Sequence, residues 1–149
     1  MSNSSHYKDY FLSHRHITNE LIGKIDKEHY EYQPTPTSMP AQKLVTHMLT
    51  SFYGLASAAA KQAPKQIDNQ DVALSKLAEL YTDETVKLIE SLTDEALEET
   101  IDLSDTMGMK VPAGKLLEVA IDHEINHKGN LFVYVREMGY TDLPMFVKK

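Results

Sequence analysis

Two histidines and a glutamate near the C-terminal end of the chain could bind a metal ion. His123, Glu124 and His127 stand in the stretch HEINH, which has the H-E-x-x-H spacing of zinc proteases, where the histidines bind zinc and the glutamate is the general base. Side chains four residues apart on a helix share one face. The pair could therefore chelate a metal ion, with or without protease chemistry, or it could consist of ordinary core or surface histidines.

A zinc protease needs a third ligand after this pair, and the sequence does not supply one. The extended form of the motif requires Gly where Asn130 stands and His where Val133 stands. The next glutamate, Glu137, lies on the same expected helix, about 15 Å along its axis from His127 at a rise of about 1.5 Å per residue. One ion cannot reach both side chains, so we do not expect a protease.

A third histidine elsewhere in the chain could complete a metal site of another kind. Of the seven histidines, His47 lies midway along an expected helix, on a face with small and apolar neighbours that would leave room for an ion. His123 and His127 also project from an apolar stripe, so three imidazoles are expected to point inward, where buried nitrogens need partners. Imidazole is a good ligand for zinc, nickel, copper or iron. The other histidines are expected to be solvated, terminal or in loops: His6, His14, His16 and His29.

Glu124 lies about 100° around the helix from His123, off the apolar stripe. Three roles are open to it at this point. It could form a hydrogen bond that orients a metal-binding histidine, act as a general base, or be a solvated residue.

Four helices are expected to position these residues. Each shows apolar residues near helical spacing, and proline- and glycine-containing breaks separate them. The expected helices span about 5–27, 40–61, 72–92 and 112–139, with Pro40 at a helix start and Gly139 at a helix end. Only the stretch 105–112 could form a short extended pair. The pattern predicts an all-α four-helix bundle, formed by a single domain over residues 1–149.

Composition excludes several classes of function. The formal net charge of −7 lacks the basic footprint of a nucleic-acid-binding protein. The absence of cysteine excludes disulfides, thiolate metal ligands and a cysteine nucleophile. No apolar run reaches the roughly 20 residues that span a bilayer, and the N-terminal stretch has no signal pattern. We therefore expect a cytoplasmic protein that binds neither nucleic acid nor membrane.

The chain resembles the DinB-like (DNA-damage-inducible) four-helix metal-binding proteins. The resemblance rests on His47 within MPAQKLVTHMLTSFYG, on His123 and His127 within DHEINHKGNLFVYVREMGY, and on the closing GYTDLPMF. It covers nearly the whole chain. Two features depart from the family pattern: the last helix has Asn126-His127-Lys128-Gly129-Asn130 where the family often has H-H-R-G-Q, and tryptophan is absent.

The resemblance implies an up-down-down-up bundle whose three histidines, His47, His123 and His127, bind a divalent metal, usually zinc or nickel. It also implies a small-molecule substrate and, for some members, transferase or isomerase chemistry with a low-molecular-weight thiol such as bacillithiol, mycothiol or glutathione. We expect a metal-dependent thiol transferase acting on a small electrophile. The alternatives are a metal-dependent hydrolase and a non-enzymatic metal-binding or stress-related bundle protein.

A second apolar stripe on the last expected helix points to self-association. It lies opposite the histidines and contains Ile121, Ile125 and Phe132, with Val135 nearby. A bundle helix needs only one buried stripe, so the second is expected to form a homodimer interface. The alternative is that the N-terminal segment or the C-terminal tail of the same chain covers it.

Overall fold

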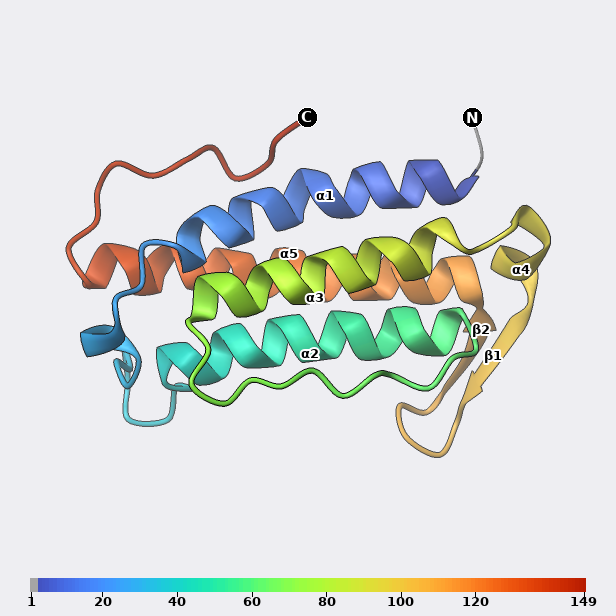
Figure 1. The fold of residues 1–149 in the computed structure, drawn as a ribbon, viewed down its shortest axis with the longest axis horizontal. Coiled ribbons are helices and arrows are strands. Elements are labelled where there is room, and N and C mark those ends of the chain that lie inside the picture. The colour runs from blue at the N-terminus through green and yellow to red at the C-terminus, as the bar shows by residue number, and fades with distance from the viewer. Residues whose placement is uncertain (1–2) are drawn as a thin grey trace.

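The computed structural model describes residues 3–149 and places four long helices side by side (Figure 1). These helices are α1 (Asn3–Ile22), α2 (Ala41–Ala59), α3 (Leu74–Glu90) and α5 (Ala113–Glu137). Helices α2 and α3 run in one direction, and α1 and α5 run in the other (Figure 1). The predicted four-helix bundle with up-down-down-up topology is therefore confirmed.

The parallel run of α2 and α3 requires a long return connection between them. Residues 60–73 supply it by passing back along α2 from its end to the start of α3 (Figure 1). This segment is the break predicted between the second and third expected helices. Tyr53 holds it near its beginning, since the Tyr53 hydroxyl accepts a hydrogen bond from the Lys65 backbone N–H at 2.9 Å.

The helix ends differ from the predicted ones by a few residues. Helix α1 ends at Ile22 rather than at Lys27, and a short 3-10 helix, η1 (Lys27–His29), follows it. Helix α5 ends at Glu137, and Gly139 forms the C-terminal cap as predicted. Gly139 has a φ of 105°, and the N–H groups of Gly139 and Tyr140 bond to the carbonyls of Arg136 and Val135. This pattern is a Schellman cap, in which glycine adopts the left-handed conformation without strain.

Two short elements between α3 and α5 were not predicted at their actual positions. Helix α4 (Asp94–Glu98) begins after Thr93, whose hydroxyl accepts a hydrogen bond from the Ala96 N–H. Strands β1 (Thr100–Leu103) and β2 (Met109–Pro112) form an antiparallel hairpin in which Thr100 pairs with Pro112. The sequence indicated only residues 105–112 as an extended pair. The first strand instead lies upstream of that stretch, where four residues of alternation are too few to detect.

The core consists of two apolar clusters placed one after the other along the bundle. One cluster joins the second half of α1 with the first half of α2 and the last third of α5; among its members are Leu21, Leu44 and Leu131. The other joins Phe11, Phe52 and Leu117, near the opposite end. Buried polar residues of α1 and α5 lie between the two clusters, at the level where the candidate site is found.

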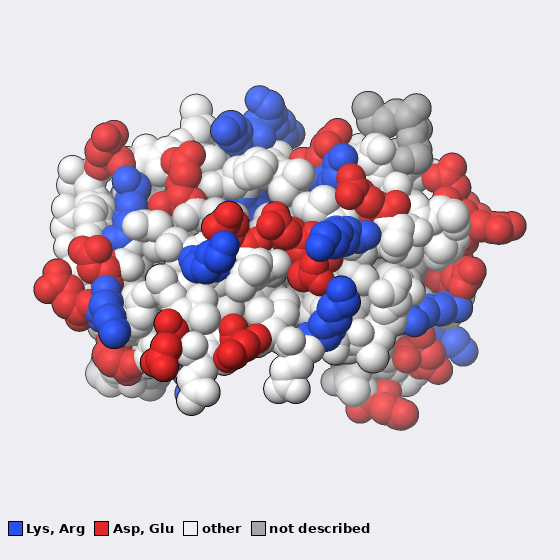
Figure 2. Space-filling view, viewed as in Figure 1, with Lys and Arg blue, Asp and Glu red and all other residues white. Residues whose placement is uncertain are grey.

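The surface carries charges of both signs. On the face drawn in Figure 2, acidic and basic side chains are interspersed. Glu84 illustrates the local pairing, since it contacts Lys65 at 3.1 Å and Lys87 at 2.9 Å. The described residues include no helix long and apolar enough to cross a membrane.

Candidate metal centre

The three predicted histidines meet between α2 and α5. His47 extends from α2, and His123 and His127 extend from successive turns of α5. The Nε2 atoms of His47 and His123 are 3.1 Å apart, and one ring nitrogen from each of the three lies within 4.8 Å of the others. The ring centroids are 4.4 to 5.0 Å apart. The structure thus brings together residues that are 76 positions apart in the sequence.

The spacing of these nitrogens is compatible with a shared metal ion. Zinc–nitrogen bonds of about 2.0–2.1 Å in a tetrahedral site place two ligand nitrogens about 3.3 Å apart. All three rings are half-buried. Burial, followed by the proximity of the other imidazoles, lowers the pKa of His47 and of His123, which favours the neutral form that binds metals. A hydrogen bond between two neutral imidazoles would also suit the 3.1 Å distance.

Two polar neighbours orient the rings from their far sides. Asn130 Oδ1 lies 3.2 Å from His127 Nδ1, and because an amide oxygen can only accept, His127 Nδ1 carries the hydrogen and Nε2 keeps a free lone pair. Ser51 Oγ lies 3.3 Å from His47 Nδ1. Metal-binding histidines commonly have such partners, which fix the tautomer and the ring angle. Neither contact could be predicted from the sequence, because a serine or an asparagine one helical turn from a histidine gives no signal of a hydrogen bond to its ring.

Glu124 points into the core, away from the group of three histidines. It is 2 % exposed, so the interpretation as a solvated residue was wrong. Its two carboxylate oxygens accept hydrogen bonds from Arg15 Nε and Nη2 at 2.8 and 2.9 Å, and Thr18 Oγ1 donates a third at 2.7 Å. Burial alone would raise the pKa of Glu124, but the Arg15 charge and these hydrogen bonds outweigh it and hold the pKa below its ordinary value.

Arg15 links this carboxylate to the rest of the bundle. Its side chain is fully buried, with the guanidinium carbon 4.8 Å above the Phe11 ring and 5.5 Å from the Phe52 ring. Its third nitrogen, Nη1, donates a hydrogen bond to Thr82 Oγ1 of α3 at 3.3 Å. One arginine therefore contacts side chains of all four long helices. Sequence reasoning missed it because a charged residue within the polar stretch SHRH gives no signal of burial.

His14 and Lys128 form a second buried polar contact on the same side of α5. The prediction that His14 is solvated was wrong, since it is 7 % exposed and its Nδ1 lies 2.6 Å from Lys128 Nζ. Lys128 is 2 % exposed and also donates to the backbone carbonyl of Phe146. The C-terminal tail folds back over α1 in this way (Figure 1). Its other anchor is the Lys148 N–H, which donates to the Ser13 carbonyl at 2.8 Å.

The second apolar stripe of α5 is covered within the chain. Ile121, Phe132 and Val135 are 1 %, 8 % and 0 % exposed, and Ile125 is partly buried against the same core. They pack with residues of α1 such as Phe11 and Leu21. The expectation that this stripe forms a homodimer interface was therefore wrong, and the alternative of cover by the N-terminal segment describes the packing.

The remaining histidines lie outside the candidate site. His6 and His16 are exposed, as predicted, and His29 lies in η1. A second group of three residues with ligating atoms close together includes His29, with Asp26 and Glu28. Its two carboxylates are exposed, and clusters of this kind are common at surfaces without a metal ion.

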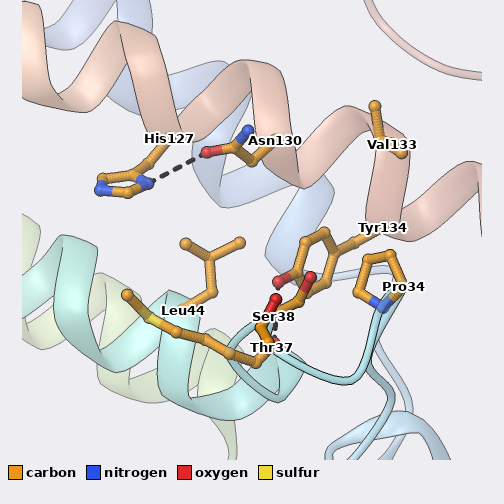
Figure 3. A pocket seen from close by; sticks show the side chains of 9 residues that line it. Pro34, Thr37, Ser38, Leu44, His127, Asn130, Val133 and Tyr134 are labelled. Atoms are coloured by element: carbon orange, nitrogen blue, oxygen red, sulfur yellow. Dashed lines mark hydrogen bonds between the residues drawn. The ribbon is translucent and has the colours of Figure 1, made fainter.

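Two cavities adjoin the three histidines. The first, here called the Asn130 cavity, measures about 390 Å³ and is lined by Thr37, Ser38, His127, Asn130 and Tyr134, among others. Figure 3 shows the His127 and Asn130 side chains extending from α5 into this space, opposite Leu44. The second, the Met107 cavity, measures about 400 Å³ and is lined by His47, Gly54, Leu55, Met107, Val119 and His123, with Thr50 and Ser51.

Comparison with known proteins places these features in a family. The model of the DinB family matches residues 1–148. The chain is 46 % identical to the uncharacterized protein YjoA of Bacillus subtilis over 153 residues, which cover all of this chain and 99 % of that protein. The crystal structure of that DinB-like protein superposes with a TM-score of 0.88 over 97 % of this chain and 99 % of that one. A DinB-like protein from Bacillus cereus, 18 % identical, shares the fold with a TM-score of 0.72, over 93 % of this chain and 94 % of the other.

Proposed function

The chain belongs to the DinB family, and we propose that His47, His123 and His127 bind a divalent metal ion, zinc or nickel, at the centre of an enzyme active site. The observation that carries the proposal is the convergence of three half-buried imidazole nitrogens from two helices within 4.8 Å. One shared ion could bind a nitrogen of each ring at the same time.

The number of ligands favours catalysis over a purely structural site. Among the described residues, the group contains three ligating side chains, whereas structural zinc sites are closed by four. Cavities adjoin the histidines on two sides, so a small molecule has space beside the nitrogens. Glu124 is engaged by Arg15 and Thr18, and we assign it a role in holding α5 rather than that of a general base.

We propose thiol-dependent transfer to a small electrophile as the reaction. A divalent ion held by three neutral imidazoles would lower the pKa of a bound thiol and so favour the thiolate at neutral pH. The thiol loses its proton to solvent, its sulfur forms a bond to the electrophilic carbon, and the leaving group departs with the bonding electrons. In this scheme the histidines hold the site, and Ser51 and Asn130 fix the ring angles.

The test of this reaction combines metal loading with a two-substrate screen. Protein loaded with zinc or nickel is mixed with 1-chloro-2,4-dinitrobenzene and, in turn, glutathione, cysteine or bacillithiol, and chloride release and thioether formation are followed. The proposal expects turnover that requires both the metal and a thiol. Turnover with water alone would indicate the hydrolase alternative. Stoichiometric metal binding with no reaction in either screen would favour the non-enzymatic alternative.

A cytoplasmic location and a homodimer also remain proposals. The covered stripe on α5 removes one reason to expect the dimer but leaves other surfaces of the chain available. Sedimentation velocity at micromolar concentration tests it directly, since a dimer of this 16.9 kDa chain would sediment clearly faster than a monomer.

A further inference from the structure

The three histidines lie in the middle of a groove between α2 and α5, with one cavity on each side. The two helices run antiparallel (Figure 1), so the first half of α2 faces the second half of α5. The Asn130 cavity is lined by Leu44, before His47, and by residues that follow His127. The Met107 cavity is lined by residues that follow His47 and by Val119, before His123. The cavities therefore extend from the histidines in opposite directions.

The two ends of the groove differ in chemistry. The Asn130 cavity has a mixed lining, in which Thr37, Ser38, Asn130 and Tyr134 lie beside apolar residues (Figure 3). Its apolar residues are Pro34, Met39, Leu44 and Val133. The Met107 cavity is more apolar, since its wall beyond the histidines and the hydroxyls of Thr50 and Ser51 is formed by Gly54, Leu55, Met107 and Val119. A molecule seated across the histidines would meet hydrogen-bonding groups mainly on one side and apolar groups on the other.

Gly54 keeps the Met107 cavity open, and packing does not explain its presence. A Cβ atom added at Gly54 would meet no atom within 4 Å, so no neighbouring element needs to approach the backbone there. Glycine in the middle of a helix is unfavourable relative to alanine. Gly54 therefore leaves free, at the wall of the cavity, a space that any larger side chain would occupy.

Met107 closes the same cavity from the β1–β2 turn. Its side chain is 44 % exposed, although it is a large apolar residue. It precedes Gly108, whose φ of 66° lets the turn adopt a left-handed conformation. Methionine is flexible and polarisable, and it adapts to apolar groups of different shapes. The turn thus places an adaptable apolar side chain beside His47 and His123.

We propose that the Met107 cavity binds an apolar alkyl or aryl group of the substrate, and so selects amphipathic molecules whose reacting atom lies at the histidines. This inference deepens the proposed function and rests on it for the identity of the reacting atom. The apolar binding itself requires no metal. Its test can therefore be separated from the test of the reaction.

The first experiment uses metal-free protein and toluene, which has no metal-binding group. Protein labelled with ¹³C at the methionine methyl groups is titrated with toluene, and the Met107 signal is assigned from a Met107→Leu variant. We expect a saturable shift of the Met107 signal, with smaller changes at exposed Met145. Equal or greater change at Met145, or no shift at Met107, would overturn the proposal.

Two glycine variants provide a matched comparison. Gly54→Leu fills the cavity, whereas Gly129→Leu adds the same side chain at an exposed glycine of α5 where a Cβ also meets nothing within 4 Å. Both changes replace a helical glycine by a better helix former, so both variants should fold. Gly54→Leu is expected to abolish the toluene-dependent shift of Met107, and Gly129→Leu to preserve it. Equal effects of the two variants would contradict the assignment of the cavity.

The second experiment uses cobalt-loaded protein and a series of n-alkanethiols from ethanethiol to hexanethiol. Binding is followed by the sulfur-to-cobalt charge-transfer absorption. Burial of each added methylene predicts an increase in affinity of about fourfold, and Gly54→Leu should remove this dependence on chain length. Failure of cobalt to bind would contradict the metal site but leave the toluene result intact. Affinity independent of chain length in the wild-type protein would overturn the apolar pocket while the metal site stands.

Discussion

The Nε2 atoms of His47 and His123 lie 3.1 Å apart, although the two residues belong to different helices and are 76 positions apart in the sequence. His127 completes the group one helical turn further along α5, with its ring 5.0 Å from that of His47. A pair four residues apart on one helix is common and weakly informative. The convergence of a third imidazole from another helix makes a shared ligand the simplest account of all three.

Removing Asn130 or Ser51 tests whether these side chains orient metal ligands. Each contacts the Nδ1 atom of a histidine whose other nitrogen faces the group. Asn130→Ala and Ser51→Ala are expected to weaken zinc affinity by about 10- to 100-fold while leaving one ion bound at saturation. Competition with a chelating indicator measures the affinity. Asn126→Ala, at an exposed position next to His127, is the control, and an equal loss of affinity there would refute the specific roles of Asn130 and Ser51.

The Arg15–Glu124 pair is expected to be the most sensitive polar contact in the core. Removing one partner leaves an uncompensated buried charge, so Arg15→Met and Glu124→Leu should each lower the free energy of unfolding by about 3–5 kcal/mol. The double variant should lose less than the sum of the two single losses. Urea denaturation followed by far-ultraviolet circular dichroism provides the measurement. Additive losses would show that the two side chains are not energetically coupled.

Exposed ion pairs provide the contrast for that experiment. Lys61 and Glu99 lie 2.5 Å apart, with side chains that are 58 % and 50 % exposed. Solvent screening leaves such pairs little net effect, so Lys61→Met should change the free energy of unfolding by less than about 1 kcal/mol. A loss as large as that of Arg15→Met would contradict the assignment of stability to the buried pair.

The pH dependence of metal binding follows from the direction of the histidine pKa shifts. Protons compete with the metal for the imidazole nitrogens. Because burial lowers the pKa of His47 and of His123, both rings stay neutral to a lower pH than a free histidine, whose pKa is about 6.5. Proton competition at these two ligands should therefore set in at a lower pH than at free histidines, so their contribution to zinc affinity should be lost mainly below about pH 6.5. Indicator titrations on both sides of this pH measure it. A decline that begins well above pH 7 would contradict neutral, buried ligands.

Most of the fold, and the three members of the candidate site, could be predicted from the sequence. Periodic apolar residues and proline breaks indicated the four long helices, and His47 could be paired with His123 because both lie on inward faces. The partners of Glu124 could not be predicted in this way. Arg15 and Thr18 lie in a polar stretch of α1, and their burial depends on how α1 packs against α3 and α5.

The apolar stripe on α5 is a second feature whose packing partner could not be predicted from the sequence. Its residues were identified correctly, but periodicity does not reveal whether the cover comes from the same chain or from a second copy. Phe132 and Val135 pack into the cluster that contains Leu21 of α1. Helix α5 is thus buried on two faces by its own bundle, as its place beside both α1 and α2 requires.

The most direct test of the metal centre is the metal content of the protein and of its histidine variants. Purified protein is stripped with a chelator, dialysed against zinc or nickel, and analysed by inductively coupled plasma mass spectrometry. Three matched samples are compared: wild-type, His47→Ala and His16→Ala, the last at an exposed histidine of α1. The account predicts one ion per chain in wild-type and His16→Ala, and a loss of at least about 100-fold in affinity in His47→Ala. Absence of stoichiometric metal in the wild-type protein, or unchanged metal in His47→Ala, would contradict it.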